Sequence, residues 1–251
     1  MLWRKILIAV LVLVALGTLI FTLGFKNGSE DGICKGAAVK IHDIGGNNFI
    51  TEKDVFLLLN QNSLNPVNKE IRSVKLDKIR AIIEEFAGVK SAKVYFTKSD
   101  KLNIEIYQRE PVFKIINNDD YFVDTERVLV PNNIDFCLYL PVVSGTVTKT
   151  FATNELFDFV SFIEKDKFLS ALVQQIYVTP VQEVQLVPEV GNQTIIVGKI
   201  VKKEGRYDFE KKFNRLKKFY ASDALNKLGW DTYSTIDLRY DKQVVCKKIE
   251  K

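Results

Sequence analysis

The first hydrophobic pattern in the chain is an apolar run that begins at Ile6, ends at Phe25 and holds no charge. Fourteen of its twenty residues are Ile, Leu, Val or Phe, and a helix of that length spans about 30 Å, the thickness of a bilayer core. Arg4 and Lys5 precede the run, so the positive-inside rule places residues 1–5 in the cytoplasm. A transmembrane helix over residues 6–25 is therefore predicted, with the bulk of the chain extracytoplasmic.

A cleaved signal peptide is the alternative explanation of this run. Signal peptides have an apolar core of roughly 7–15 residues and a small-residue cleavage site. The run here is longer, and the residues after it, Lys26-Asn27-Gly28-Ser29, offer no such site. A retained anchor in the inner (cytoplasmic) membrane is the interpretation we adopt, followed by a polar, glycine-rich linker over residues 26–37.

Beyond the linker, alternating and helical periodicities follow one another over residues 38–109. Thr51 and Asp54 form a variant of the capping box at a helix start, and Gly88 is placed to stop a second helix. The pattern predicts a strand over 39–44, a helix from Thr51 to about 60, a helix over 73–87, and strands over 89–96 and 102–107. This strand-helix-helix-strand-strand order indicates a small α+β layer.

Residues 110–251 show a mixed pattern that is richer in strands. The predicted strands cover 112–116, 121–124, 128–130, 176–179, 184–187 and 194–197. Helices are expected after a cap at Thr153, over 168–172, and over 207–228. The last of these carries a basic outer face made of Lys211, Lys212, Arg215, Lys217 and Lys218. That face is either simply solvated or contacts anionic lipid or an acidic partner.

Composition narrows the classes of function. The net charge of +5 comes from dispersed basic residues, which argues against a nucleic-acid partner. Cys34, Cys137 and Cys246 lie far apart, and His42 is the single histidine, so neither a zinc site nor a hydrolase triad is expected. Nucleotide-binding and zinc-protease motifs do not occur. We predict no enzyme, cofactor, metal or small-molecule substrate; an exported enzyme with His42 as base is the opposing hypothesis.

Short motifs then occur in a definite order. Arg109-Glu110-Pro111-Val112 closes the first module, and Leu140-Pro141 with Gly145 gives an L-P-x-x-x-G string. Asp237-Leu238-Arg239-Tyr240 follows a Gly-Trp pair near the C-terminus. In this order the chain resembles the FtsQ/DivIB family of bacterial division proteins, whose first module is a POTRA domain. The resemblance implies a POTRA-like domain over 38–109 and an FtsQ-type β domain over 110–251.

The C-terminal residues are the candidate partner-binding site. We expect one edge strand in which Tyr240, Lys242, Val244 and Cys246 alternate, with one side left open to a partner chain. The resemblance implies that a division protein of the FtsB type, itself in complex with FtsL, binds this edge at the septum. The candidate contact residues are Arg239, Tyr240, Asp241, Lys242, Gln243, Val244, Val245, Cys246 and Lys247.

A POTRA-bearing chaperone for envelope protein export is the remaining alternative. It would require tandem POTRA units or a following β-barrel. The sequence contains one such unit and no series of about ten-residue alternating segments. The pattern therefore favours a division scaffold.

Overall fold

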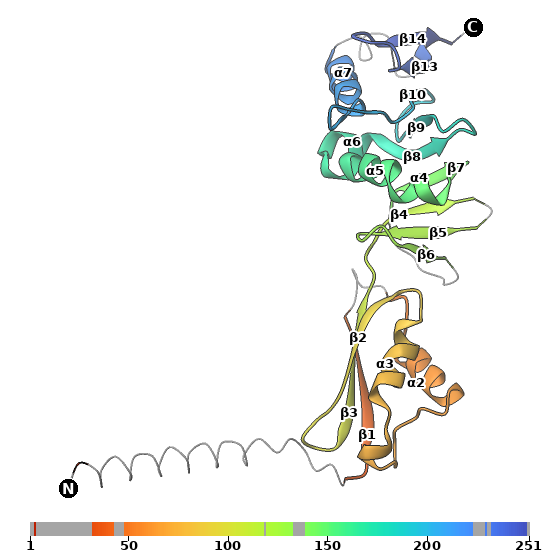
Figure 1. The fold of residues 1–251 in the computed structure, drawn as a ribbon. Helices are drawn as coiled ribbons and strands as arrows, with labels where there is room; N and C mark the ends of the chain where they lie inside the picture. Colours follow the sequence, from red (N-terminus) through yellow and green to blue (C-terminus); the bar gives the residue numbers. More distant parts are fainter. Residues whose placement is uncertain are drawn as a thin grey trace. The chain divides into compact units, whose positions relative to one another are not determined.

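A computed structural model describes residues 3, 32–42, 48–117, 119–132, 139–222, 229 and 232–249. The chain forms two compact units, divided between Gln108 and Arg109, and each is α+β as expected (Figure 1). The predicted cytoplasmic tail over 1–5, the membrane helix over 6–25 and residues 26–31 of the predicted linker lie outside the described residues, apart from Trp3. Within the described ranges, no helix is long and apolar enough to cross a membrane.

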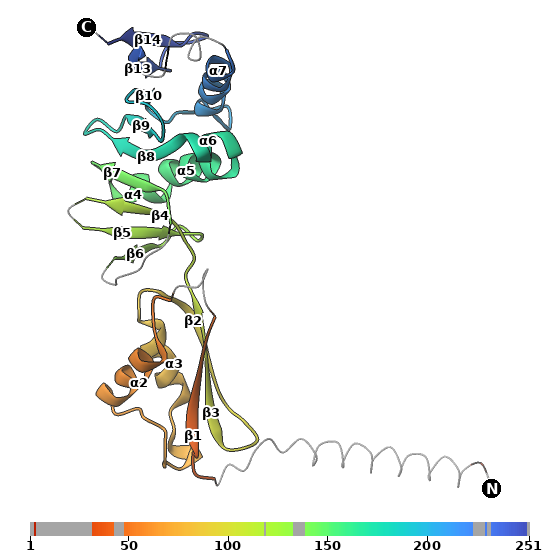
Figure 2. The same cartoon turned by 180° about the vertical axis from the view of Figure 1, so that it is seen from behind.

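The first unit is a three-stranded sheet with two helices on one face, as Figures 1 and 2 show from opposite sides. Its strands lie in the order β1-β3-β2, with β1 parallel and β2 antiparallel to β3. The elements are β1 (Gly36–His42), α2 (Glu52–Gln61), the 3₁₀ turn η1 (Ile71–Ser73), α3 (Leu76–Glu84), β2 (Val89–Phe96) and β3 (Lys101–Gln108). The predicted element order is confirmed.

Local signals explain most of this unit. The Thr51 side chain accepts a hydrogen bond from the Asp54 N–H, and the Asp54 carboxylate accepts one from the Thr51 N–H, so the predicted capping box forms. Leu102, Ile104 and Ile106 alternate along β3 and are fully buried. The predicted role of Gly88 is wrong, because α3 ends at Glu84. A Cβ at Gly88 would lie 2.4 Å from the Cβ of Phe49, so this glycine permits close packing instead.

The second unit is built on a nine-stranded sheet in the order β14-β13-β10-β9-β8-β7-β4-β5-β6. The strands are β4 (Pro111–Ile116), β5 (Tyr121–Asp124), β6 (Leu129–Pro131), β7 (Val142–Gly145), β8 (Val173–Val178), β9 (Val184–Pro188), β10 (Thr194–Gly198), β13 (Tyr233–Asp237) and β14 (Val245–Lys248). A separate hairpin joins β11 (Lys202–Lys203) to β12 (Arg206–Tyr207).

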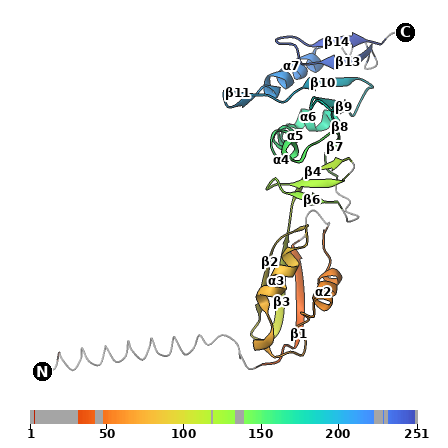
Figure 3. The same ribbon diagram turned by 45° about the vertical axis from the view of Figure 1, so that its right-hand side comes forward.

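Helices cover one face of this sheet (Figure 3). They are α4 (Lys149–Thr153), α5 (Glu155–Lys165), α6 (Lys167–Leu172) and α7 (Phe209–Ala221). The first three connect β7 to its parallel neighbour β8, and α7 connects β10 to its parallel neighbour β13. Parallel neighbours require such long crossovers, whereas antiparallel ones can be joined by a tight hairpin.

One row of residues, paired from strand to strand, lies in the hydrophobic core across this sheet from β5 to β14. In register order it runs through Tyr121, Ile115, Val143, Ile176, Leu186, Ile195, Ile236 and Cys246. All but Cys246 are buried, and Cys246 is partly buried against the same core. The core therefore extends to the last strand of the sheet.

Three predictions fail in this unit. Thr153 is the last residue of α4, while Thr148 caps that helix and Asn154 precedes α5. The helix expected over 207–228 ends at Ala221, because Ser222 has an extended backbone; residues 223–228 lie outside the described residues. The single C-terminal strand is instead a hairpin of β13 and β14, and Lys242 in its connection has a left-handed φ of 59°.

Candidate functional site

β14 forms one edge of the nine-stranded sheet. It pairs with β13 through the register Ile236↔Cys246 and Asp237↔Val245. No other strand in the described part of the chain pairs with β14, so its outer side presents main-chain groups to the surroundings. Unpaired N–H and C=O groups on a strand edge are a template for adding another strand.

The direction of these main-chain groups follows from two contacts. The Ile249 N–H donates to the Thr232 carbonyl at 3.1 Å, and the Lys247 carbonyl accepts from the Ser234 hydroxyl at 3.2 Å. In an antiparallel strand the main-chain N–H and C=O of one residue point to one side, and those of the next residue point to the other. Residues 245, 247 and 249 therefore bond toward β13, while Cys246 and Lys248 direct their main-chain groups outward.

Side chains alternate across the sheet as well. Val244 and Cys246 pack against the core under the helices, and burial raises the pKa of the Cys246 thiol. Val245 and Ile249 lie on the opposite face, 39% and 44% exposed. Lys247 and Lys248 are also exposed and keep the free edge soluble. The edge thus combines open hydrogen-bonding groups with a mixed apolar and basic surface.

The structure separates the predicted contact residues into two groups. Residues 245–247 lie on the edge strand, whereas residues 239–244 form the connection that precedes it. Within that connection the side chain of Tyr240 is half exposed. The expected alternation of Tyr240, Lys242 and Val244 along one strand is wrong, because the chain reverses direction there.

Arg239 is tied to the sheet. Its guanidinium contacts the Asp237 carboxylate at 2.7 Å and the Glu183 carboxylate at 3.3 Å. Burial raises the pKa of Asp237, but hydrogen bonds from the Arg239 side chain and N–H outweigh it and hold that pKa below its ordinary value. Gly198 leaves room for the Arg239 side chain, since a Cβ at position 198 would lie 2.7 Å from the Arg239 Cγ.

Sequence reasoning missed the part that α7 plays at this site. Lys212 is buried and donates to the Val197 carbonyl at 2.9 Å, and Arg215 donates to the Leu238 and Tyr240 carbonyls at 3.0 and 3.1 Å. Lys217 pairs with Asp166. The predicted basic outer face is therefore wrong for these three residues, while Lys211 and Lys218 are exposed. The available signal was their position: Lys212 and Arg215 directly precede the apolar Phe213 and Leu216, and Lys217 directly follows Leu216, so all three border the apolar stripe of the helix.

Comparison with known proteins agrees with this architecture. The family model described as FtsQ/DivIB, C-terminal related, matches residues 110–247, which is more than half of the chain. The chain belongs to the FtsQ/DivIB family. A POTRA-like domain model matches residues 32–107. A search of curated proteins finds no match to this chain.

Membership of the FtsQ/DivIB family implies a septal protein with a role in cell division, one that interacts with other division proteins. Both matched families consist of non-enzymatic scaffold domains. His42, the base of the opposing enzyme hypothesis, lies at the end of β1. It stacks on the Tyr107 ring with centroids 4.3 Å apart, and its Nε2 is 4.0 Å from the Glu105 carboxylate. His42 thus packs on the neighbouring strand β3 and contributes to the structure of the POTRA-like unit.

Proposed function

We propose that this chain is a single-pass division scaffold that binds other single-span division proteins, of the FtsB/FtsL type, by strand addition at β14. The main observation in support is that the outer side of β14 is unpaired within the described residues. A partner strand would extend the nine-stranded sheet there and gain main-chain hydrogen bonds.

The core row that ends at Cys246 supports the same proposal. Ile236 is buried and Cys246 is partly buried beside it. A strand placed outside Cys246 would set an apolar side chain next to the end of this row. Such a partner would be selected both by its main chain and by its side-chain alternation.

The proposed contact residues follow from these positions. Residues 245–247 would lie beside the partner strand, with the main-chain hydrogen bonds made by Cys246 and, just beyond them, Lys248. Tyr240 to Val244 would border it. Arg239 would act indirectly, because its ion pairs hold the connection against the sheet. Residues 6–25 would anchor the chain in the inner membrane, with residues 1–5 in the cytoplasm, and so confine both units to the membrane plane near their partners.

Proline substitution on β14 tests this proposal directly. Cys246→Pro removes an outward N–H and leaves the bonds toward β13 intact. Cys246→Ala is the matched control, because it trims the same side chain and keeps the N–H. The full-length chain would be co-expressed with short bitopic division proteins and recovered by affinity purification. We expect capture of the partner to fall at least about tenfold for Cys246→Pro and to persist for Cys246→Ala.

The folded state must be verified in the same preparations. Hydrogen exchange of the β13 amides reports whether the hairpin survives. If Cys246→Pro disturbs it, Lys248→Pro serves in its place, since Lys248 is exposed at the strand end. Normal capture by a folded proline variant would refute strand addition at this edge.

A further inference from the structure

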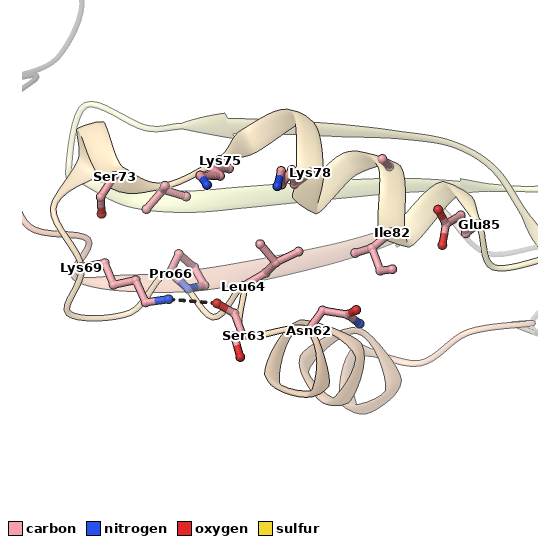
Figure 4. Close-up of a pocket in the computed structure, with 12 residues that line it drawn as sticks. Asn62, Ser63, Leu64, Pro66, Lys69, Ser73, Lys75, Lys78, Ile82 and Glu85 are labelled. Carbon is pink, nitrogen blue, oxygen red and sulfur yellow. Dashed lines mark hydrogen bonds between the residues drawn. The ribbon is translucent and has the colours of Figure 1, made fainter.

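A groove lies on the helical side of the POTRA-like unit, between the end of α2, the following loop and α3 (Figure 4). Its volume is about 610 Å³, within the range of roughly 300–1,000 Å³ that is typical of ligand-binding pockets. Leu64, Pro66, Val74 and Ile82 supply its apolar surface, and Lys69, Lys75 and Lys78 its charged surface. These residues lie outside the strands of the three-stranded sheet, so the groove is separate from that sheet's edges.

The loop that forms one wall is held in a fixed conformation. The Leu64 N–H donates to the Leu59 carbonyl at 2.8 Å, and the Asn68 N–H donates to the Cys34 carbonyl at 2.9 Å. Lys69 donates from its Nζ to the Ser63 carbonyl at 3.1 Å, the dashed line of Figure 4. Ser63 and Asn68 both have left-handed backbones, with φ of 57° and 63°. Strained backbone that its surroundings hold in place is common at binding sites.

The charge of the groove is strongly one-sided. Lys75 and Lys78 are exposed, and no hydrogen bond or ion pair joins either ammonium group to another described residue. Lys75 is also the N-cap of α3, and no side chain caps that helix. The first N–H groups of a helix carry partial positive charge, which adds to the two ammonium groups. Glu85 is the single acidic residue among those that line the groove.

We propose that this groove binds a short acidic segment of a partner protein. An aliphatic side chain of that segment would lie between Leu64 and Ile82, which point into the space between the helices in Figure 4. Carboxylates next to it would pair with Lys75 and Lys78. A peptide fits better than a lone anion, because the groove offers apolar surface and positive charge side by side. The site lies on a different unit from β14, so it is independent of the strand-addition proposal.

Peptide binding to the full-length chain tests this inference. The probe is a fluorescein-labelled peptide, Ala-Leu-Glu-Glu-Leu-Ala, followed by fluorescence anisotropy. Peptides with Gln-Gln or Lys-Lys in place of Glu-Glu are the ligand controls. The site variant is Lys75→Glu with Lys78→Glu. The protein control is Lys53→Glu with Lys98→Glu, which changes two exposed lysines of the same unit outside the groove and gives the same net charge.

We expect the acidic peptide to bind the parent and the control chain equally, and the site variant at least roughly tenfold more weakly, since two ion pairs are lost and replaced by repulsion. An Ile82→Asn variant should also bind it more weakly. Equal binding by parent and site variant, equal loss in the control, or equal binding of the Lys-Lys peptide would each overturn the proposal. So would failure to bind the peptide together with lysine-dependent binding to phosphatidylglycerol vesicles, which would identify a lipid surface instead.

Discussion

The two units use buried polar groups differently. Among the described residues, the POTRA-like unit buries one polar side chain, Gln108, whereas the second unit buries Gln193 and the charged Asp124, Lys212 and Asp237. Each of these charged groups bonds to main-chain atoms next to the end of a strand. The first unit is held together mainly by apolar packing between neighbouring elements. In the second unit, buried charged side chains additionally hold the main chain where it leaves a strand.

This difference changes what mutations should do. Removing one partner of a buried charge leaves the other desolvated and unpaired, which costs more than the pair itself contributes. The second unit should therefore be sensitive at a few charged positions, and the first at packing and cap positions. Hydrogen exchange measured on peptides from each unit can separate the two responses.

The largest effect is expected at Asp124. Its side chain is 2% exposed, accepts from the N–H groups of Glu126 and Val128, and pairs with Arg109 at 2.8 Å. Asp124→Ala should lower the free energy of unfolding of the second unit by about 3–5 kcal/mol, as measured by urea denaturation. Asp120→Ala, at an ion pair 3.9 Å long in the same hairpin, should change it by less than about 1 kcal/mol. Similar losses in both variants would contradict the proposed role of charge burial.

Gln108 tests whether the first unit depends on a polar contact as well. Its side chain accepts from the Phe49 N–H at 2.5 Å and donates to the His42 carbonyl at 3.0 Å. Gln108→Ala should cost about 2–3 kcal/mol, because these buried groups lose their partner. Thermal unfolding and exchange of the β3 amides would measure the loss, with the exposed Gln61→Ala as control. An effect as large as that of Asp124→Ala would remove the contrast between the units.

Tyr207 adds a pH dependence to the second unit. Burial and a hydrogen bond to Asp158 at 2.7 Å raise its pKa from 10.0 to about 12. The fold therefore favours the neutral phenol, so this contribution is complete below pH 10 and is lost as the pH rises to about 12. Tyr207→Phe should lower the free energy of unfolding by about 1–2 kcal/mol at neutral pH. This difference from the parent protein should disappear as the pH rises from 10 to about 12. Urea unfolding of both proteins over this pH range measures it, and a difference that stays constant would contradict the role given to the Tyr207 hydroxyl.

The smallest effect is expected at the cap of α2. Thr51→Ala removes the acceptor for the Asp54 N–H and should cost about 1 kcal/mol in the first unit. Thr51→Ser keeps the hydroxyl and should restore most of the stability. Both are measured by urea denaturation with exchange of the α2 amides. No difference between alanine and serine would mean that the capping box contributes nothing measurable.

Elements of the first unit could be read from the sequence because their signals are local. The strand predicted from Val89 to Phe96, before the turn at residues 97–100, matches β2 to the residue, and Thr51 with Asp54 marked the start of α2. The failures lie where distant contacts decide. Gly88 follows a helix at the spacing of a stop signal, yet its real constraint is Phe49, far away in sequence.

The C-terminal region shows the same limit at the candidate site. Its alternation indicated a strand, and the composition indicated a basic edge. The division into β13 and β14 was hidden, because Arg239, which holds the connection between them, pairs with Glu183 at a separation of 56 positions in the sequence. Lys212 and Arg215 were expected on the outer face of the helix for the same reason, since their carbonyl partners come from β10 and the end of β13.

By itself, the sequence determined the module order, most element types and the apolar faces, because these depend on periodicity, caps and turn residues within a few positions. The tertiary structure decided which strand ends the sheet, which main-chain groups point outward from it, and which lysines remain available for a partner. Those properties depend on strand order and on hydrogen bonds between residues tens of positions apart, and no local pattern encodes them.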